Sequence, residues 1–227
     1  MRDIIFIGAN NPEVLAMLDA LGPSGKYRFL GFVDNDRSKK GTSFCGLPVH
    51  GTFSDLTDLS PDSISFVNLI TRDAETRFET SKAIADLGFR FENFIHPSVD
   101  LSGVTLGTGN YIQRNTVLQI DVKIGHNACI NSGSVVSHES SIGSSCFIAP
   151  GVTIAGLVAI QDGALIGAGA TILPRLKVGA WSVVGGGAVV TKDVPPNTIN
   201  AGVPAQTMRT KSEQYKTGNP WGSDDKS

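Results

Sequence analysis

Aliphatic residues recur at every sixth position through the second half of the chain. The series runs without a gap through Leu106, Ile112, Leu118, Ile124, Ile130, Val136, Ile142, Ile148, Ile154, Ile160, Ile166, Ile172, Val178, Val184 and Val190. The side chain two residues before each of these positions is nearly always small or β-branched. An α-helix cannot bury this pattern, because six residues turn through about 600° and successive aliphatics would move around the helix.

A series of short strands explains the pattern better than one long strand. Glycine and proline recur at a fixed phase of the repeat, which a continuous strand does not tolerate. Hexapeptide repeats are typical of a parallel β-helix, in which each repeat makes one short face and one corner. Three faces make a triangular coil, so residues 104–190 predict about five coils with no inserted loop. The large aliphatics then point inward and stack from coil to coil.

The first hundred residues show a different pattern, in which apolar runs alternate with helical spacing. Strands are predicted at residues 4–10, 27–36 and 64–70. One helix is predicted from an Asn11 N-cap and Pro12 to about residue 21, and another over 74–88. Strands alternating with helices predict a small parallel α/β sheet. The predicted fold class is therefore an α/β domain followed by a β-helix.

Composition and charge exclude several classes of function. The 227 residues suffice for two small domains, and 26 glycines lie mostly in the second half. A net charge of −2 without a basic block argues against nucleic acid as the main partner. The sequence has neither an apolar run that could span a bilayer nor a signal-peptide pattern. Three cysteines without metal-ligand spacing predict free thiols, and hence a cytoplasmic protein.

One corner of the repeat carries candidate chemistry. Corners fall two and three residues after each aliphatic, and many hold turn formers such as Pro150-Gly151. His138 and Glu139 fill one corner, although neither favours a tight turn. A carboxylate beside an imidazole can orient it and raise its basicity. From these residues alone, a catalytic pair and a polar surface corner are equally supported, whereas His126 at another corner is interpreted as a solvated histidine.

A second candidate site lies at the end of the first predicted strand. Gly8 precedes a helix start, where a phosphate or nucleotide could bind, and Asp34 ends the second strand, where it could bind a ribose or a base. The stretch GANNPEV has one glycine, so a full Gly-x-Gly-x-x-Gly is absent. The residues alone therefore favour a tight turn with a helix cap.

The hexads resemble those of the left-handed parallel β-helix acyltransferases, and AVVTKDVPPNTINAGVPAQTMR (188–209) resembles their exit segment. With the short Rossmann-like domain before them, residues 1 to about 210 resemble bacterial sugar N-acetyltransferases of bacillosamine and perosamine type. The resemblance implies a Rossmann-like sugar-nucleotide-binding domain at 1–95 and a left-handed β-helix acetyltransferase domain at 96–193. An exit segment and tail follow at 194–227, and the polar stretch 211–227 is expected to be mobile at its end.

The resemblance also implies a reaction. The enzyme would transfer acetyl from acetyl-CoA directly to the 4-amino group of a nucleotide-linked 4-amino-4,6-dideoxy sugar. His138 would be the general base, Glu139 would position it, and Gly156, one coil later, would offer the oxyanion donor. The alternative is a sialic acid or other sugar O-acetyltransferase, because the same base would serve a hydroxyl.

Further binding residues follow from the same resemblance. FVDND matches the family, and the expected substrate contacts are Gly8, Asn10, Asp34, Asp36 and, near the acceptor amine, Asn131. The expected contacts to the cofactor acetyl-CoA are Ala168, Gly186, Phe147 and Lys192. Phe147 stands where some family members carry a second histidine near the acetyl group.

The expected assembly is a homotrimer with the active site between chains, without a metal, and serving O-antigen or other glycan biosynthesis. A metal enzyme such as a γ-type carbonic anhydrase would need three histidines, and only His126 and His138 lie in the repeat. A non-catalytic scaffold is a further alternative, because GANNPEV and Phe147 depart from the family pattern.

Overall fold

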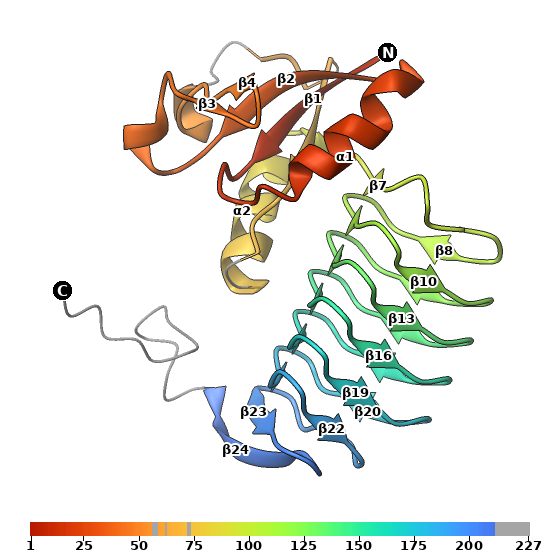
Figure 1. Ribbon diagram of the computed structural model, residues 1–227. Helices are drawn as coiled ribbons and strands as arrows, with labels where there is room; N and C mark the ends of the chain where they lie inside the picture. The colour runs from red at the N-terminus through yellow and green to blue at the C-terminus, as the bar shows by residue number, and fades with distance from the viewer. Residues whose placement is uncertain (56–58, 62, 72–73, 212–227) are drawn as a thin grey trace.

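The computed structural model describes residues 1–55, 59–61, 63–71 and 74–211. A small α/β unit caps one end of a long three-sided β-helix, and the strands of the helix succeed one another as rungs (Figure 1). Within the described ranges, no helix combines the length and the apolarity that crossing a membrane requires.

The N-terminal unit is a parallel sheet of four strands in the order β2-β1-β5-β6. The strands are β1 (Arg2–Ile7), β2 (Tyr27–Val33), β5 (Ile64–Asn68) and β6 (Arg90–Phe91), with helices α1 (Val14–Leu21) and α2 (Ala74–Asp86). A hairpin of β3 (Ser43–Phe44) and β4 (Leu47–Pro48) and the 3₁₀ helices η1 (Gly22–Ser24), η2 (Arg37–Lys39) and η3 (Phe53–Asp55) complete it. Phe6, Phe32 and Phe66 are fully buried in this sheet. The predicted alternation is thereby confirmed.

The first helix begins later than the sequence predicts. Asn11 and Pro12 form a turn before the helix, because the Asn11 carbonyl accepts from the Val14 N–H at 3.2 Å. The Asn11 side chain accepts from the Glu13 N–H at 3.1 Å rather than from a helical residue. The residue that precedes the helix is therefore Glu13, which makes no side-chain cap hydrogen bond.

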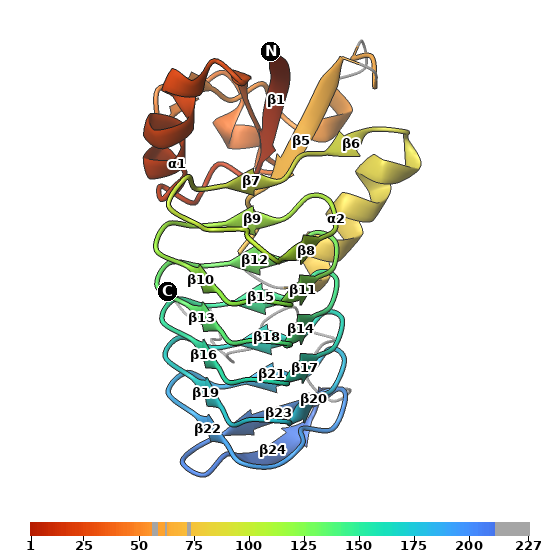
Figure 2. The ribbon, with the colours of Figure 1, turned by 90° about the vertical axis from the view of Figure 1, so that its right-hand side faces the viewer.

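The β-helix consists of three parallel sheets, one on each side of the coil (Figure 2). The first sheet contains β10 (Val117–Leu118), β13 (Val135–Val136), β16 (Thr153–Ile154), β19 (Thr171–Ile172) and β22 (Val189–Val190). The second contains β8 (Thr105–Leu106), β11 (Lys123–Ile124), β14 (Ser141–Ile142), β17 (Ala159–Ile160) and β20 (Lys177–Val178). The third contains β7 (Phe94–Ile95), β9 (Tyr111–Ile112), β12 (Cys129–Ile130), β15 (Phe147–Ile148), β18 (Leu165–Ile166), β21 (Val183–Val184), β23 (Thr198–Ala201) and, antiparallel, β24 (Gln206–Thr210).

Every predicted inward aliphatic is the second residue of one of the strands β8 to β22. Each pairs in register with its equivalent one coil away, as Ile130 does with Ile148. The small residues two positions earlier, such as Ala128 and Ser134, are fully buried beside the corners. Burying one large aliphatic side chain contributes about 1.5–3 kcal/mol, so the stack of aliphatics stabilises the β-helix along its whole length.

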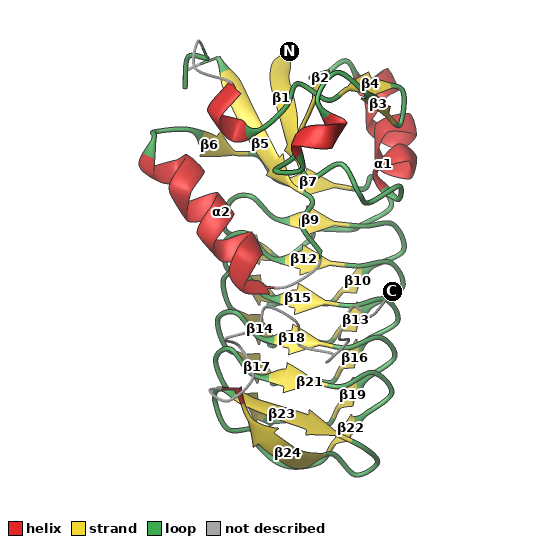
Figure 3. Ribbon diagram, turned by 90° about the vertical axis from the view of Figure 1, so that its left-hand side faces the viewer, coloured by secondary structure: helices red, strands yellow, loops and turns green. Residues whose placement is uncertain are grey.

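The coil turns at three edges, which we name by what they carry. The histidine edge follows the first sheet and holds Ile120-Asp121, His138-Glu139, Gly156-Leu157, Pro174-Arg175 and Lys192-Asp193. The glycine edge precedes that sheet and holds Ser132-Gly133, Pro150-Gly151, Ala168-Gly169 and Gly186-Gly187. The helix edge holds His126-Asn127, Ser144-Ser145, Asp162-Gly163 and Ala180-Trp181, and α2 runs along it (Figure 3).

The outward faces of the three sheets differ in their exposure. Tyr111 and Cys129 on the third sheet are fully buried and belong to the same hydrophobic cluster as Phe6 and Phe32 of the N-terminal unit. The first sheet instead presents an apolar or threonine side chain in every coil, and none of these is fully buried. We call this surface the open face, and it consists of Val117, Val135, Thr153, Thr171 and Val189.

Candidate active site

His138 and Glu139 face each other at one corner of the histidine edge. The His138 Nδ1 atom lies 3.1 Å from Glu139 Oε2, and both side chains are about half exposed. The His138 main-chain N–H donates to the Gln119 side chain at 2.9 Å, which fixes the corner from the coil before. With Nδ1 held by the carboxylate, Nε2 is the ring nitrogen left for a proton transfer.

Gly156 lies directly against the imidazole. A Cβ atom at this position would lie 2.7 Å from His138 Nε2 and 2.8 Å from Cε1, so any other residue would displace the ring. The Gly156 N–H donates no hydrogen bond to any described residue, whereas the next N–H, of Leu157, donates to the His138 carbonyl at 3.0 Å. A proton acceptor and a free N–H donor are thus adjacent, as acyl transfer requires.

The predicted acetyl-CoA contacts lie in three different places. Ala168 and Gly186 are exposed neighbours in successive coils of the glycine edge, and neither N–H has a hydrogen-bond partner among the described residues. Phe147 is half-buried on β15 of the third sheet, and Lys192 is exposed on the histidine edge. One chain therefore does not bring these four residues together with His138.

Asn131 also lies away from His138, at the corner between the third and first sheets. It is buried, and its Nδ2 donates to the Ile148 carbonyl at 2.7 Å and contacts Cys129 Sγ at 3.7 Å. Its predicted contact with the acceptor amine stays a prediction.

The N-terminal unit contains a cavity of about 200 Å³ at the carboxyl ends of β1, β2 and β5. Among the residues that the structure describes, none of the β-helix lines it. The lining includes three of the predicted substrate contacts, Gly8, Asn10 and Asp34, together with Ile7, Val33, Asn35, Phe53, Leu69, Ile70, Thr71, Thr76, Thr80 and Ile84. Asp36 is outside the lining, because its carboxylate turns toward the N–H and the hydroxyl of Ser38.

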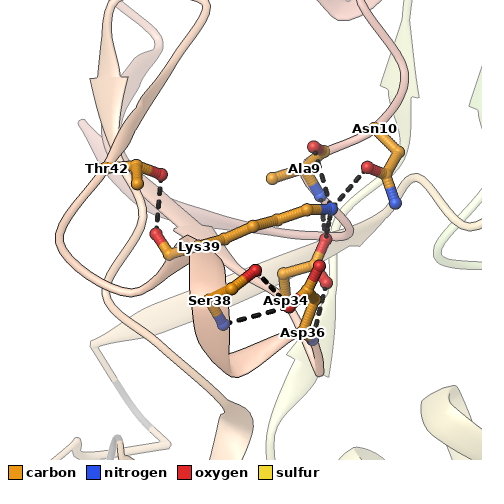
Figure 4. A network of polar contacts seen from close by, with 7 residues as sticks. All are labelled: Ala9, Asn10, Asp34, Asp36, Ser38, Lys39 and Thr42. Carbon is orange, nitrogen blue, oxygen red and sulfur yellow. Dashed lines mark hydrogen bonds and ion pairs between the residues drawn. The ribbon is translucent and has the colours of Figure 1, made fainter.

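A polar network ties the cavity wall together (Figure 4). Asp34 accepts from the N–H groups of Ala9 at 2.8 Å and Asp36 at 2.9 Å, and its Oδ2 lies 2.9 Å from Lys39 Nζ. Burial opposes ionisation of Asp34, but these donors outweigh it and hold the pKa of the carboxyl below its ordinary value. Asp34 is therefore a carboxylate that joins the end of β2 to the turn after β1.

Two residues near the cavity were not singled out from the sequence. Lys39 reaches the side chains of Asn10 and Asp34, but its place in the charged run DNDRSKK gives no signal of this. Arg77 is fully buried, and its guanidinium donates to the carbonyls of Asn68 at 2.7 Å and Asn127 at 2.9 Å. It thereby joins the N-terminal unit to the helix edge.

No cluster of three metal-ligating side chains occurs among residues 1–55, 59–61, 63–71 and 74–211. His126 lies on the helix edge, and its Nδ1 accepts from the Thr108 N–H at 3.1 Å. The two histidines of the repeat therefore occupy different edges, as the spacing of twelve residues predicts.

Comparisons with known proteins find a matching family and similar solved structures. Residues 121–156, which contain His138, Glu139 and Gly156, match the family described as bacterial transferase hexapeptide (six repeats). PerB from Caulobacter crescentus, solved with CoA and GDP-perosamine, is 30% identical with a TM-score of 0.82 over 92% of this chain and 98% of that one. The chain belongs to the left-handed β-helix sugar N-acetyltransferases.

Two further solved structures support the assignment. The acetyltransferase domain of PglB from Neisseria gonorrhoeae is 28% identical with a TM-score of 0.82, over 92% of this chain and all of that one. WeeI from Acinetobacter baumannii is 26% identical with a TM-score of 0.80 over the same shares. A comparison with curated protein sequences gives no match. The chain is an acetyltransferase with a Rossmann-like domain and a left-handed β-helix, as the sequence predicts.

Proposed function

We propose that the protein transfers acetyl from acetyl-CoA to the 4-amino group of a nucleotide-linked 4-amino-4,6-dideoxy sugar, with His138 as general base. The observation that carries this proposal is that the His138 ring packs so closely on Gly156 that a Cβ there would lie 2.7 Å from Nε2, while Glu139 holds Nδ1 at 3.1 Å. The similar Caulobacter protein was crystallised with CoA and GDP-perosamine, and the similar PglB domain with acetyl coenzyme A.

The residues divide the work of one direct transfer. The sugar amine attacks the thioester carbonyl, and His138 Nε2 takes the proton that the amine loses, which contributes roughly 10²–10⁴-fold to the rate. The Gly156 N–H donates to the oxyanion of the tetrahedral intermediate. When the carbon–sulfur bond breaks, the imidazolium returns its proton to the departing thiolate. Glu139 keeps the ring in place and stabilises its charged form.

The N-terminal unit, residues 1–95, is proposed to hold the nucleotide. Its cavity lies where parallel α/β sheets bind ligands, at the carboxyl ends of the strands. Gly8, Asn10 and Asp34 line this cavity, whereas Asp36 would need to turn away from Ser38 to take part. Residues 96–193 then form the catalytic domain. In the exit segment and tail, 194–227, the stretch 212–227 lies outside the described residues.

A homotrimer is proposed because one chain separates the two halves of the site. His138 and Lys192 lie on the histidine edge, whereas Ala168 and Gly186 lie on the glycine edge. The open face between these edges offers an apolar surface, with Val117 49% exposed, on which a second copy can pack. In such an assembly, the free N–H groups of Ala168 and Gly186 suit the pantetheine arm of acetyl-CoA. A cytoplasmic, metal-free enzyme of glycan biosynthesis is the corresponding biological proposal.

The reaction is tested by thiol release from acetyl-CoA with a panel of UDP-, dTDP- and GDP-linked 4-amino-6-deoxy sugars. We expect release with one of them and its loss in His138→Ala. The sialic acid alternative is tested in the same assay with free sialic acid and with 4-hydroxy sugar nucleotides. Thiol release with a hydroxyl acceptor alone would support O-acetylation in place of N-acetylation. No thiol release with any acceptor, from a folded protein, would contradict the proposal that a sugar of these classes accepts the acetyl group.

The shared site is tested by mixing two inactive chains. His138→Ala damages the histidine edge, and Ala168→Trp would block the glycine edge at an exposed position. If each site takes one edge from each of two chains, an equal mixture regains about a quarter of the wild-type activity. Two affinity tags verify that mixed trimers form. Mixed trimers without activity would contradict a site shared between these edges.

A further inference from the structure

In α/β nucleotide-binding domains, the helix after the first strand usually binds the phosphates with free N–H groups. In α1, the N–H groups at this end are already hydrogen-bonded. The Glu13 N–H donates to Asn11 Oδ1, Pro12 has no N–H, and the N–H groups of Val14 and Leu15 donate to turn carbonyls at 3.2 and 3.0 Å. The Glu13 carboxylate adds negative charge here, 3.0 Å from Arg114. Because free N–H groups are what a helix N-terminus offers an anion, α1 lacks the usual cradle.

A lysine from a neighbouring element contacts the turn between β1 and α1, beside the cavity but outside its lining residues. Lys39, the last residue of η2, extends across the turn after β1, and its Nζ contacts the Asn10 side chain, Asp34 Oδ2 at 2.9 Å and the Ala9 carbonyl at 3.4 Å (Figure 4). Asn10 and Asp34 both line the cavity. The Lys39 side chain is 23% exposed, so it is held in place yet open to a ligand.

One of the three contacts of Lys39 is long enough to be exchanged for a ligand oxygen. An ammonium group has three donors, and the contact with the Ala9 carbonyl is the longest of the three. A phosphate oxygen can replace this carbonyl while Asp34 and Asn10 keep the ammonium oriented. Other cations nearby serve elsewhere, as Arg114 does in its ion pair with Glu13. Arg77 is fully buried against main-chain carbonyls, and Lys40 pairs with Asp55 at 2.6 Å.

We infer that Lys39 binds the diphosphate of the nucleotide sugar, in place of the N-terminus of α1. Asp34 and Asn10 then act as positioning residues for its ammonium group. This inference rests on the proposed function, because it assumes that the cavity holds a nucleotide. Charge-assisted hydrogen bonds to phosphate are among the strong polar contacts in proteins, so one lysine can carry this preference.

The test compares nucleoside diphosphates with the matching nucleosides. Binding of GDP, UDP and dTDP, and of guanosine, uridine and thymidine, is measured by calorimetry on the full chain. Lys39→Met is expected to weaken binding of the preferred diphosphate about tenfold and to leave the nucleoside unchanged. Lys40→Met is the matched control, because it removes an adjacent lysine that pairs with Asp55 instead, and it should bind both ligands as the wild type does.

The outcomes separate this inference from the proposed function. If the wild type binds a diphosphate and Lys39→Met binds it equally well, the inference is overturned while the proposed function stands. If the wild type binds no nucleotide, the proposed role of the cavity fails first. A variant with a weakened fold would lose nucleoside and diphosphate binding together, which melting curves would reveal.

Two measurements keep the inference testable if Lys39→Met does not fold. Lys39→Arg keeps the charge and should retain the preference for the diphosphate over the nucleoside. In the wild type, that preference should shrink as salt rises from low to high ionic strength, because a contact between exposed charges is screened. A preference that does not change with salt would overturn the role of Lys39.

Discussion

Two edges of the same β-helix have the same backbone conformation but different residues. In most coils, the third residue after the aliphatic adopts a left-handed conformation at both edges, although Asp193 at the last corner of the histidine edge does not. On the glycine edge it is Asn115 in the first coil, with φ 59°, and then Gly133, Gly151, Gly169 or Gly187, with φ between 67° and 72°. On the histidine edge it is Asp121, Glu139, Leu157 or Arg175, with φ between 58° and 64°. A left-handed φ costs a residue with a side chain about 1–2 kcal/mol more than glycine, so the histidine edge is the strained one.

The two edges are therefore suited to different tasks. The glycine edge exposes main-chain groups, and the N–H groups of Ala168 and Gly186 are free for a ligand that lies along the backbone. The histidine edge presents side chains. At its centre, Glu139 adopts the strained left-handed φ, and its carboxylate contacts His138 Nδ1. Strained residues cluster at functional sites because the surrounding structure holds them there.

Replacing the histidines on two different edges should have very different consequences for kcat. His138→Ala should lower kcat for acetyl transfer roughly 10²–10⁴-fold, because the base is lost and the backbone is retained. Its melting temperature should stay that of the wild type, since the side chain is half exposed. Steady-state thiol release measures the first effect, and thermal melting measures the second.

His126→Ala is the matched control, because it also removes a corner histidine of the repeat. Its Nδ1 accepts from the Thr108 N–H, so a small loss of stability with normal kcat is expected. Equal losses of kcat in the two variants would mean that the histidine edge has no special role.

The second prediction compares alanine substitutions at two glycines, one beside His138 and one with a left-handed backbone. Gly156 does not have a left-handed φ, so alanine is acceptable to its backbone, but the added Cβ would lie 2.7 Å from His138 Nε2. Gly156→Ala should therefore lower kcat about 10²–10³-fold with little loss of stability. Gly151→Ala meets no atom within 4 Å but has φ +69°, so it should lose about 1–2 kcal/mol of unfolding free energy and keep its activity. The reverse pattern in kinetics and denaturant melts would contradict the assignment of Gly156.

The repeat is the part of the molecule that the sequence specifies most completely. A period of six repeated from Leu106 to Val190 places each inward side chain, because an error in register would expose a whole face. The same arithmetic puts Gly156 one coil after His138, and the structure has them in contact. It also separates both residues from Ala168, which lies on another edge.

The N-terminal site is less predictable because its contacts are not periodic. Asp34 ends a strand as predicted, but its partners Ala9 and Lys39 come from separate segments of the chain. Arg77 lies on a helix of low mean hydropathy, where an exposed side chain is the ordinary expectation, and it is fully buried. The boundary of α1 at Val14 depends on the Asx turn at Asn11, which competes with helix capping.

The third prediction separates the cost of the left-handed backbone at Glu139 from the contribution of its carboxylate to catalysis. Glu139→Gly should relieve the left-handed strain and gain up to about 1 kcal/mol of stability, reduced by the greater freedom of glycine in the unfolded chain. It should lower kcat about tenfold, because His138 loses the partner that orients it. Glu139→Gln keeps the strain and removes the charge, so it should lose activity without gaining stability. A Gly variant with full activity would show that the carboxylate does not serve the base.

The last prediction asks whether left-handed strain on the histidine edge lowers stability at a residue that has no proposed catalytic role. Its expected effect is the weakest of the four. Arg175 has φ 62° and is exposed two coils beyond Glu139. Arg175→Gly should gain at most about 1 kcal/mol of stability for the same reason as Glu139→Gly, but kcat should not change. Denaturant melts and thiol release on both variants give the comparison. If Arg175→Gly is less stable than the wild type, the arginine makes a contact that offsets its strain, and glycine would then not be the better residue along this edge.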